Sequence, residues 1–305
     1  MQTASYVRGL ELVNPTVSFK DIGGMKNLKD WVAGRKYIKA HQEEARKYGV
    51  TSIGVIFAGL PGTGKTVVAG AIANEWGVPF YRLNLSELLF SEIFGKTEHD
   101  FQHALDTISN VGPCVVLIDA VEKVFCNLPG QTNEKARRDL GTLLIWMNKS
   151  NPASLNYANK ATGAFLVFTV NDVNALPPEF IRAGRTDALF FFDLPSATER
   201  TEIIKLNLDH YGMVISDIDR LVVLSENLVP AEIESWCKEA LVHSYKCTSS
   251  VRQPFSSVIS RVTLEDFETT VGLIVPVMKY IDINVKDFRD WARTRMARPA
   301  YNSIR

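Results

Sequence analysis

Short apolar runs alternate with longer amphipathic stretches through the first two thirds of the chain. The apolar runs cover residues 53–58, 78–83, 114–119, 164–170 and 188–194. Residues spaced as on one face of a helix lie between them, at 66–76, 96–109, 133–149 and 177–182. Strand-length apolar runs that alternate with helical patterns are typical of a parallel α/β sheet. The pattern therefore predicts an α/β core with five parallel strands.

The strand pattern nearly stops after residue 195. Helical patterns follow at 197–210, 217–225, 230–246, 263–271 and 284–297. Thr263, with Asp266 three residues later, is a typical signature of a helix N-terminus. We therefore predict two domains, a large α/β domain at 1–195 and a small all-helical domain at 196–305 that ends in a C-terminal helix.

Composition limits the possible functions. The 305 residues are 46% hydrophobic, enough for one large domain or a large and a small one. Lysine plus arginine equals aspartate plus glutamate at 34 each, so charge gives no reason to expect a nucleic-acid partner or an acidic membrane surface. The apolar runs are too short to span a membrane, and the N-terminus does not resemble a signal peptide. We expect a cytoplasmic protein, or one of the plastid stroma if plastid-encoded, with Cys114 and Cys237 as buried thiols.

Residues 59–66, GLPGTGKT, fit the phosphate-binding pattern G-x-x-x-x-G-K-[ST]. A strand pattern runs into this loop and a helical pattern runs out of it, which disfavours a chance match in a glycine-rich turn. The glycines let backbone N–H groups converge on phosphates at the positive end of the helix. Lys65 would reach the β- and γ-phosphates, and the hydroxyl of Thr66 would bind Mg²⁺. The residues predicted to contact the nucleotide here are Pro61, Gly62, Thr63, Gly64, Lys65, Thr66 and Val67.

A second acid is needed to hold the metal, and Asp119 supplies it at the end of the apolar run 114–119. An acid in that place can also cap a helix. Its position directly after a strand and downstream of the phosphate loop favours the metal. Together the two motifs predict a nucleoside triphosphate with Mg²⁺, but kinases, GTPases and motor ATPases all remain possible.

Residues 171–187, NDVNALPPEFIRAGRTD, narrow the class. They resemble the second homology region of the AAA family of ATPases, which begins with Asn and ends in L-R-x-G-R-x-D. The resemblance implies that Asn171 positions the attacking water. It also implies that Arg182 and Arg185 reach the γ-phosphate of a neighbouring subunit, where a fixed guanidinium stabilises charge on the phosphoryl oxygens. Surface arginines at a helix end are the alternative.

The segment 19–24, FKDIGG, resembles the AAA segment that lies against the adenine. The resemblance implies contacts from Asp21, Ile22 and Gly23 to the base. In the helical domain, Pro230-Ala231-Glu232 stands where the family has Gly-Ala-Glu or Gly-Ala-Asp. Ala231 is therefore expected beside the nucleotide, although no sensor arginine is evident there.

Longer stretches, such as DIGGMKNLKDWV and FRDWARTRMAR, look most like AAA ATPases of cyanobacteria and algal plastids, the hypothetical chloroplast reading frame forty-six family. The similarity runs from about Gly9 over nearly the whole chain. It implies the AAA form of the P-loop NTPase fold, with a parallel five-stranded sheet followed by a helical lid. It also implies ATP with Mg²⁺, assembly into a ring, expected to be a hexamer, and remodelling of a protein partner.

The sequence departs from the family after Asp119. The family reads D-E-I-D where this chain has Asp119-Ala120-Val121-Glu122. The missing Glu polarises the attacking water, and losing a positioned base costs on the order of 10²- to 10⁴-fold in rate. Glu122 could replace it, although an extended chain places it roughly 6.6 Å away. Otherwise the chain is a hydrolysis-deficient, nucleotide-gated scaffold or a regulatory subunit of a mixed ring, in which its arginines activate a neighbour.

Overall fold

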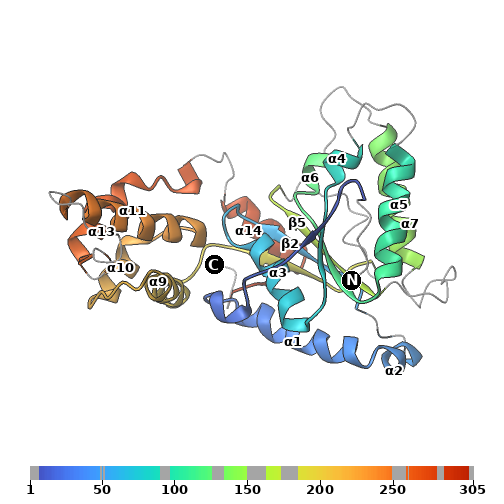
Figure 1. Ribbon diagram of the computed structural model, residues 1–305, viewed down its shortest axis with the longest axis horizontal. Helices are drawn as coiled ribbons and strands as arrows, with labels where there is room; N and C mark the ends of the chain where they lie inside the picture. Colours follow the sequence, from blue (N-terminus) through green and yellow to red (C-terminus); the bar gives the residue numbers. More distant parts are fainter. Residues whose placement is uncertain are drawn as a thin grey trace.

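The computed structural model describes residues 7–48, 50, 52–89, 97–125, 134–149, 163–172, 185–248, 259, 261–279 and 285–301. A sheet flanked by helices forms one part of the molecule, and a group of helices between residues 197 and 273 forms the other (Figure 1). The five predicted strands and the helical patterns that fall on described residues are confirmed, with ends shifted by a few residues. The pattern at 177–182 lies outside the described residues.

The strands form one sheet in the order β1-β3-β4-β5-β2-β6-β7. Their bounds are β1 Leu10–Val13, β2 Gly54–Gly59, β3 Phe80–Leu83, β4 Cys114–Ile118, β5 Ala164–Val170, β6 Ala188–Phe192 and β7 Arg298–Pro299. The five central strands, in the order β3, β4, β5, β2 and β6, are mutually parallel, as predicted. The expectation of five strands is too low, because β1 adds an antiparallel edge beside β3 and β7 a parallel edge beside β6. Neither edge strand has the continuous buried run that marks β2, β4 and β5.

Helices cover both faces of the sheet, which explains the uninterrupted apolar runs of its central strands. Successive residues of β2 alternate between two hydrophobic clusters, with Ile56 in one and Phe57 in the other. The bounds of the helices are α1 Lys26–Ala40, α2 Gln42–Lys47, α3 Lys65–Trp76, α4 Leu85–Leu89, α5 Thr97–Val111, α6 Glu122–Phe125 and α7 Glu134–Lys149, preceded by the 3₁₀ turn η1 at Phe19–Asp21. Helices α1 and α3 contribute to the Phe57 cluster, and α4, α5 and α7 to the Ile56 cluster. Cys114, which starts β4, is buried, and burial raises the pKa of its thiol to about 11.

The helices between residues 197 and 273, here called the lid, have their own core. The lid consists of α9 Ala197–Tyr211, α10 Ile218–Leu224, α11 Pro230–Thr248 and α13 Leu264–Thr270, with the 3₁₀ turns η3 Val271–Leu273 and η4 Val277–Lys279 beyond. Trp236 and Phe267 pack edge to face at 5.1 Å inside it, next to the buried Cys237. The predicted start of α13 is confirmed, since the Asp266 carboxylate accepts the N–H of Thr263 at 2.8 Å. Within the described part of the chain, no helix combines the length and apolarity that a membrane crossing requires.

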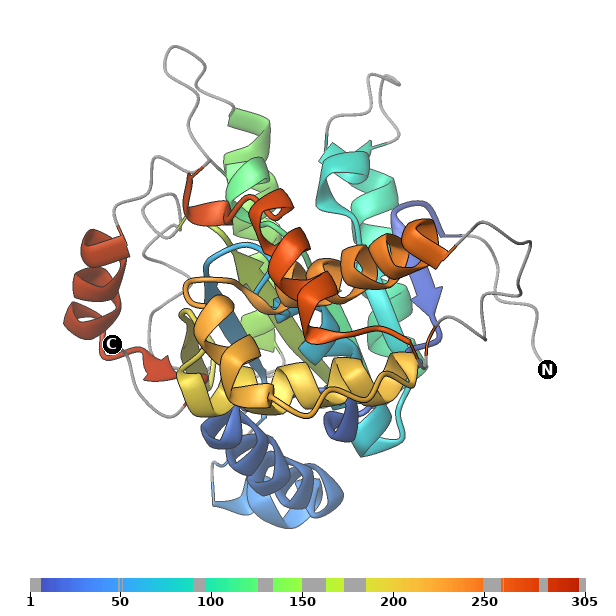
Figure 2. The same cartoon turned by 90° about the vertical axis from the view of Figure 1, so that its left-hand side faces the viewer.

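The C-terminal segment returns to the sheet. Helix α14, Val285–Thr294, places Phe288 in the hydrophobic cluster of the sheet, and its Arg289 forms two hydrogen bonds with the buried Asp193 at 2.8 and 3.0 Å. Figure 2 shows α14 (dark red) apart from the lid helices. Residues 285–301 therefore lie with the α/β part, although the sequence pattern grouped them with the helical one. An amphipathic helix pattern does not identify the surface on which the helix packs.

Candidate nucleotide-binding site

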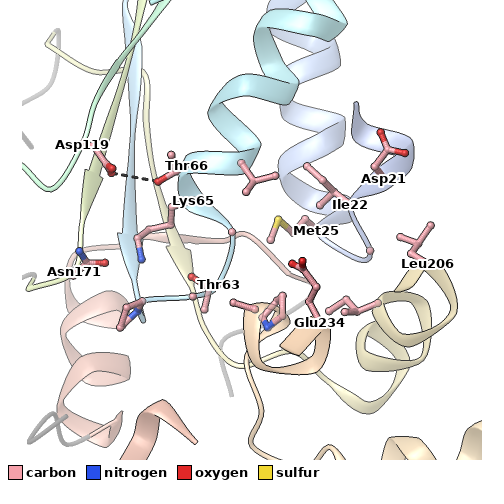
Figure 3. Close-up of a pocket in the computed structure, with 18 of the residues that line it drawn as sticks. Asp21, Ile22, Met25, Thr63, Lys65, Thr66, Asp119, Asn171, Leu206 and Glu234 are labelled. Carbon is pink, nitrogen blue, oxygen red and sulfur yellow. Dashed lines mark hydrogen bonds between the residues drawn. The ribbon is translucent and has the colours of Figure 1, made fainter. Parts of the chain in front are cut away.

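A cavity of about 460 Å³ opens between the carboxyl ends of the central strands and the lid (Figure 3). Parallel α/β sheets hold ligands at this edge, and the volume suits a small molecule. The described residues that line it are Asp21, Ile22, Gly23, Met25, Pro61, Gly62, Thr63, Gly64, Lys65, Thr66, Val67, Asp119, Ala120, Lys123, Asn171, Ile203, Leu206, Asn207, Pro230, Ala231 and Glu234. The structure thus brings most of the predicted site residues to one cavity.

The loop between β2 and α3 follows the path expected of a phosphate cradle. Gly62 and Gly64 have φ angles of 76° and 93°, in the left-handed region that side chains disfavour. A Cβ atom on Gly62 would also lie 2.9 Å from a methyl of Val229, so the lid approaches this loop closely. Gly64 caps α3, and the N-terminus of that helix therefore opens on the cavity. Free N–H groups at a helix N-terminus bind phosphate well.

The ammonium of Lys65 is held by backbone carbonyls at the start of the phosphate loop. It donates to the carbonyl oxygens of Gly59 at 2.8 Å and Leu60 at 2.7 Å, and the residue is 6% exposed. Burial lowers the pKa of Lys65 to about 8, while the carboxylates of Glu122 and Asp119 oppose the shift. Among the described residues no carboxylate pairs directly with this buried ammonium, so it is well placed to gain from an anionic ligand.

Thr66 and Asp119 meet across the cavity, as a shared metal site requires. The Thr66 hydroxyl lies 3.3 Å from Oδ1 of Asp119 (Figure 3). The Thr169 hydroxyl donates to the same oxygen. Hard oxygen ligands suit Mg²⁺, which takes one or two protein side chains and completes its shell with phosphates and waters. The described residues include no cluster of three or more histidine, cysteine or acidic side chains that could enclose a metal alone. The donor set therefore fits Mg²⁺ that arrives with a nucleotide.

Asn171 follows β5 and lines the cavity beside this pair. Its amide donates to Oε1 of Glu122 at 3.1 Å. Glu122 itself is 7% exposed and is not among the described residues that line the cavity, whereas Ala120 and Lys123 are. Its Oε2 has no hydrogen-bond partner among the described residues. Glu122 therefore supports Asn171 from behind the cavity wall, and its direct action on a water molecule stays a prediction.

The opposite end of the cavity combines the segment after η1 with the lid. Ile22 and Gly23 line it as predicted, and Asp21 does too, although its carboxylate accepts the N–H of Ser18 at 2.8 Å and so caps η1. Ala231 also lines it, and its N–H donates to the carbonyl of Gly62 at 3.1 Å. The sequence did not single out Met25, Lys123, Ile203, Leu206, Asn207, Pro230 or Glu234 as nucleotide contacts. Pro230 directly precedes the predicted residue Ala231. Ile203, Leu206 and Asn207 lie in α9, and they reach the cavity because of the way the lid packs, which no local sequence pattern indicates.

Of the two predicted arginines, Arg185 lies in a turn shortly before β6. Arg182 falls outside the described residues. Arg185 is half-buried and is not among the described residues that line the cavity, so its predicted action on a neighbouring subunit stays a prediction. Asp187 fixes this stretch, since its carboxylate accepts the N–H groups of Ile53 and Gly54 at 2.7 and 2.9 Å. Burial raises the pKa of Asp187, and the cation of Arg35 opposes that shift.

Strand β2, a glycine loop and helix α3, which carries Lys65 and Thr66, together with Asp119 directly after β4, define a P-loop NTPase. Residues 55–194 match the family described as "ATPase family associated with various cellular activities (AAA)". The chain therefore carries an AAA domain.

Similar proteins extend the likeness over most of the chain. It is 30% identical to the "Uncharacterized AAA domain-containing protein ycf46" of Gracilaria tenuistipitata var. liui, over 94% of this chain and 55% of that protein. The proteins of the same name from Trieres chinensis and Pyropia yezoensis are each 30% identical, over 98% and 92% of this chain and 56% and 53% of theirs. The predicted resemblance is thus confirmed, and the chain spans about half the length of these relatives.

Proposed function

We propose that this chain binds ATP with Mg²⁺ in the cavity between sheet and lid and uses the nucleotide to control a ring-shaped assembly. The observation that carries the proposal is the meeting of Lys65, Thr66, Asp119 and Asn171 with the lid residue Ala231 around one cavity of about 460 Å³. A nucleotide there would touch both parts of the molecule. Its binding and loss would therefore change how the lid sits on the sheet.

Each residue has a defined task in this proposal. Lys65 binds the β- and γ-phosphates, and the positive end of the α3 dipole further stabilises their negative charge. Thr66 and Asp119 hold Mg²⁺, which when bound neutralises charge on the phosphate oxygens. Asn171 orients the water that lies in line with the γ-phosphate. Ile22 and Gly23 take the base at the other end of the cavity.

We further propose a hexameric ring in which Arg182 and Arg185 of one subunit face the γ-phosphate held by the next, and in which the ring remodels a protein partner. The position of Arg185 outside the cavity of its own chain supports this placement. A ring needs the nucleotide at its subunit boundaries, so ATP should promote assembly. Sedimentation with and without ATP tests this. Arg185→Ala should reduce the ATP-dependent assembly or any ATPase rate of the assembled ring, and an unchanged result in both would argue against the placement.

A second function is favoured by the cavity wall at Ala120. A methyl group lines the wall at the position where the family has its water-polarising Glu, and Glu122 is engaged with Asn171 instead. The alternative is a nucleotide-gated scaffold, or a subunit of a mixed ring, that holds ATP for long periods and hydrolyses it on the order of 10²- to 10⁴-fold more slowly than an intact site.

Phosphate release from ATP by the purified chain separates the two, with Lys65→Ala as the blank. Release above the blank supports a working ATPase in which another acid, such as Glu122, activates the water. Tight binding of ATP without release supports the gated scaffold. ATP binding that is absent from the unaltered chain, or undiminished in Lys65→Ala, would overturn the site assignment itself.

A further inference from the structure

Thr169 holds together the segment that carries the metal-binding carboxylate. It is the next-to-last residue of β5 and is 1% exposed. Its hydroxyl oxygen accepts the N–H of Ala120 at 2.8 Å, and its O–H donates to Oδ1 of Asp119. Its backbone carbonyl accepts the N–H of Val121 at 3.1 Å. One residue of β5 therefore binds three consecutive residues beyond the end of β4.

The direction of these bonds is fixed by chemistry. A threonine hydroxyl has one proton to donate and two lone pairs that accept. Because the N–H of Ala120 can only donate, the hydroxyl of Thr169 must accept from it, and its single proton is free for Asp119. That proton points at an oxygen that accepts best when Asp119 is ionised, which is the form that binds a metal.

The backbone at this point needs such a partner. The β4–β5 ladder ends at the pair Ile118 and Phe168, and Ala120 then turns into the left-handed region with a φ of 51°. Residues other than glycine seldom adopt that conformation, and it persists only where the surroundings hold it. The two bonds from Thr169 to the N–H groups of Ala120 and Val121 hold this turn.

Thr169 is the next-to-last residue of β5, and Asn171 is the first residue after the strand. Thr169 binds the start of the segment 119–122, at Asp119, and Asn171 binds its end, at Glu122. The end of β5 and the residue that follows it therefore bind both ends of this four-residue segment. Such outer partners orient metal ligands and raise their affinity for the metal.

We propose that Thr169 is a positioning residue for the Mg²⁺ site: its hydroxyl orients the Asp119 carboxylate toward the ion and, through the N–H of Ala120, locks the turn that carries it. This inference rests on the proposed binding of ATP with Mg²⁺. It assigns a role in metal coupling to a residue that touches neither the nucleotide nor the ion. Removing the hydroxyl should therefore reduce the increase in ATP affinity that Mg²⁺ causes. The affinity for ATP without metal should stay nearly the same.

The test compares the Kd for ATP in excess Mg²⁺ with the Kd in EDTA, by isothermal calorimetry, in four forms of the chain. Thr169→Val keeps the shape but removes the hydroxyl, and Thr169→Ser keeps the hydroxyl. Thr107→Val is the matched control, because the hydroxyl of Thr107 donates to the backbone carbonyl of His103 within helix α5, away from the cavity lining. Losing an outer partner of a metal ligand typically costs 10- to 100-fold in metal affinity. We expect the ratio of the two Kd values to fall by about tenfold or more in Thr169→Val, and to be retained in Thr169→Ser and Thr107→Val.

Three results would overturn the inference: a Thr169→Val ratio equal to that of the unaltered chain, an equal loss of affinity with and without Mg²⁺, or a Thr169→Ser variant as impaired as the valine variant. If circular dichroism shows that Thr169→Val does not fold, Thr169→Ala takes its place under the same criteria, since it leaves space for a water at the N–H of Ala120. Failure of the proposed function is distinguishable, because the unaltered chain would then show no ATP binding or no effect of Mg²⁺.

Discussion

Raising the pH through 8 should weaken nucleotide binding, because Lys65 then loses its charge in the free protein. Burial holds the pKa of this lysine at about 8 when no ligand is present. A bound triphosphate adds negative charge directly at the ammonium and must raise that pKa. Binding above pH 8 is therefore accompanied by proton uptake, and linkage then requires the affinity to fall as the pH rises.

The size of the effect follows from the pKa. A lysine of pKa 8 is about 91% charged at pH 7 and about 9% charged at pH 9. If only the charged form binds phosphate, the Kd for ATP rises about tenfold between these two values, which is about 1.4 kcal/mol. The phosphate groups do not contribute, because their last ionisation lies near pH 6. Below pH 7 the lysine is already charged, so its contribution is constant there.

Calorimetric titration of Mg²⁺ and ATP at half-unit steps from pH 7 to 9 measures this effect, with circular dichroism at each pH to show that the fold persists. Lys65→Arg is the control, because a guanidinium stays charged throughout this range. Its affinity should be lower at every pH but should not decline. A constant Kd in the unaltered chain would refute the reasoning, and so would an equal decline in Lys65→Arg, since another group would then be responsible.

Three further changes have defined outcomes. Arg289→Leu removes the guanidinium that pairs with the buried carboxylate of Asp193, and should lower the free energy of unfolding by about 3–5 kcal/mol in urea. Arg293→Leu breaks its exposed pair with Asp290 and should cost less than about 1 kcal/mol, so equal losses would contradict the distinction. Phe267→Ala should cost about 3–5 kcal/mol, because this ring is fully buried in the lid core, and a smaller loss by fluorescence-detected unfolding would mean that the lid repacks. Ala120→Glu should raise phosphate release on the order of 10²- to 10⁴-fold, and an unchanged rate would show that this position does not limit turnover.

The sequence predicted those parts of the fold in which consecutive residues are buried, because such segments are recognisable as continuous apolar runs. Every residue of β2, β4 and β5 is buried, so each appears as an apolar run. Helix α1 was missed because it buries little, with Leu28 and Val32 as its fully covered side chains. Strand β7 was missed because two residues form no pattern, and only its pairing with β6 makes it a strand.

The site divides in the same way. Gly64, Lys65 and Thr66 are adjacent in sequence, and their spacing alone carries the chemistry. Leu206 and Glu234 reach the cavity from two lid helices, so their role depends on how the lid packs and leaves no local mark in the sequence. Thr169 could have been found only from the pairing of β4 with β5, because a threonine within an apolar strand is usually a plain β-former.

A substitution at position 120 should affect the rate of ATP hydrolysis without affecting the affinity for ATP to the same extent. The groups proposed to bind phosphate and metal come from the loop after β2 and from Asp119, and none of them includes the side chain that follows Asp119. The methyl of Ala120 lines the cavity, and the backbone that aims it is fixed by the two N–H bonds to Thr169. A longer side chain at this position would grow from the same Cβ into the cavity beside Asn171. A carboxylate could therefore be added there with the phosphate loop and the metal ligands unchanged, so Ala120→Glu should alter the rate of hydrolysis far more than the affinity for ATP.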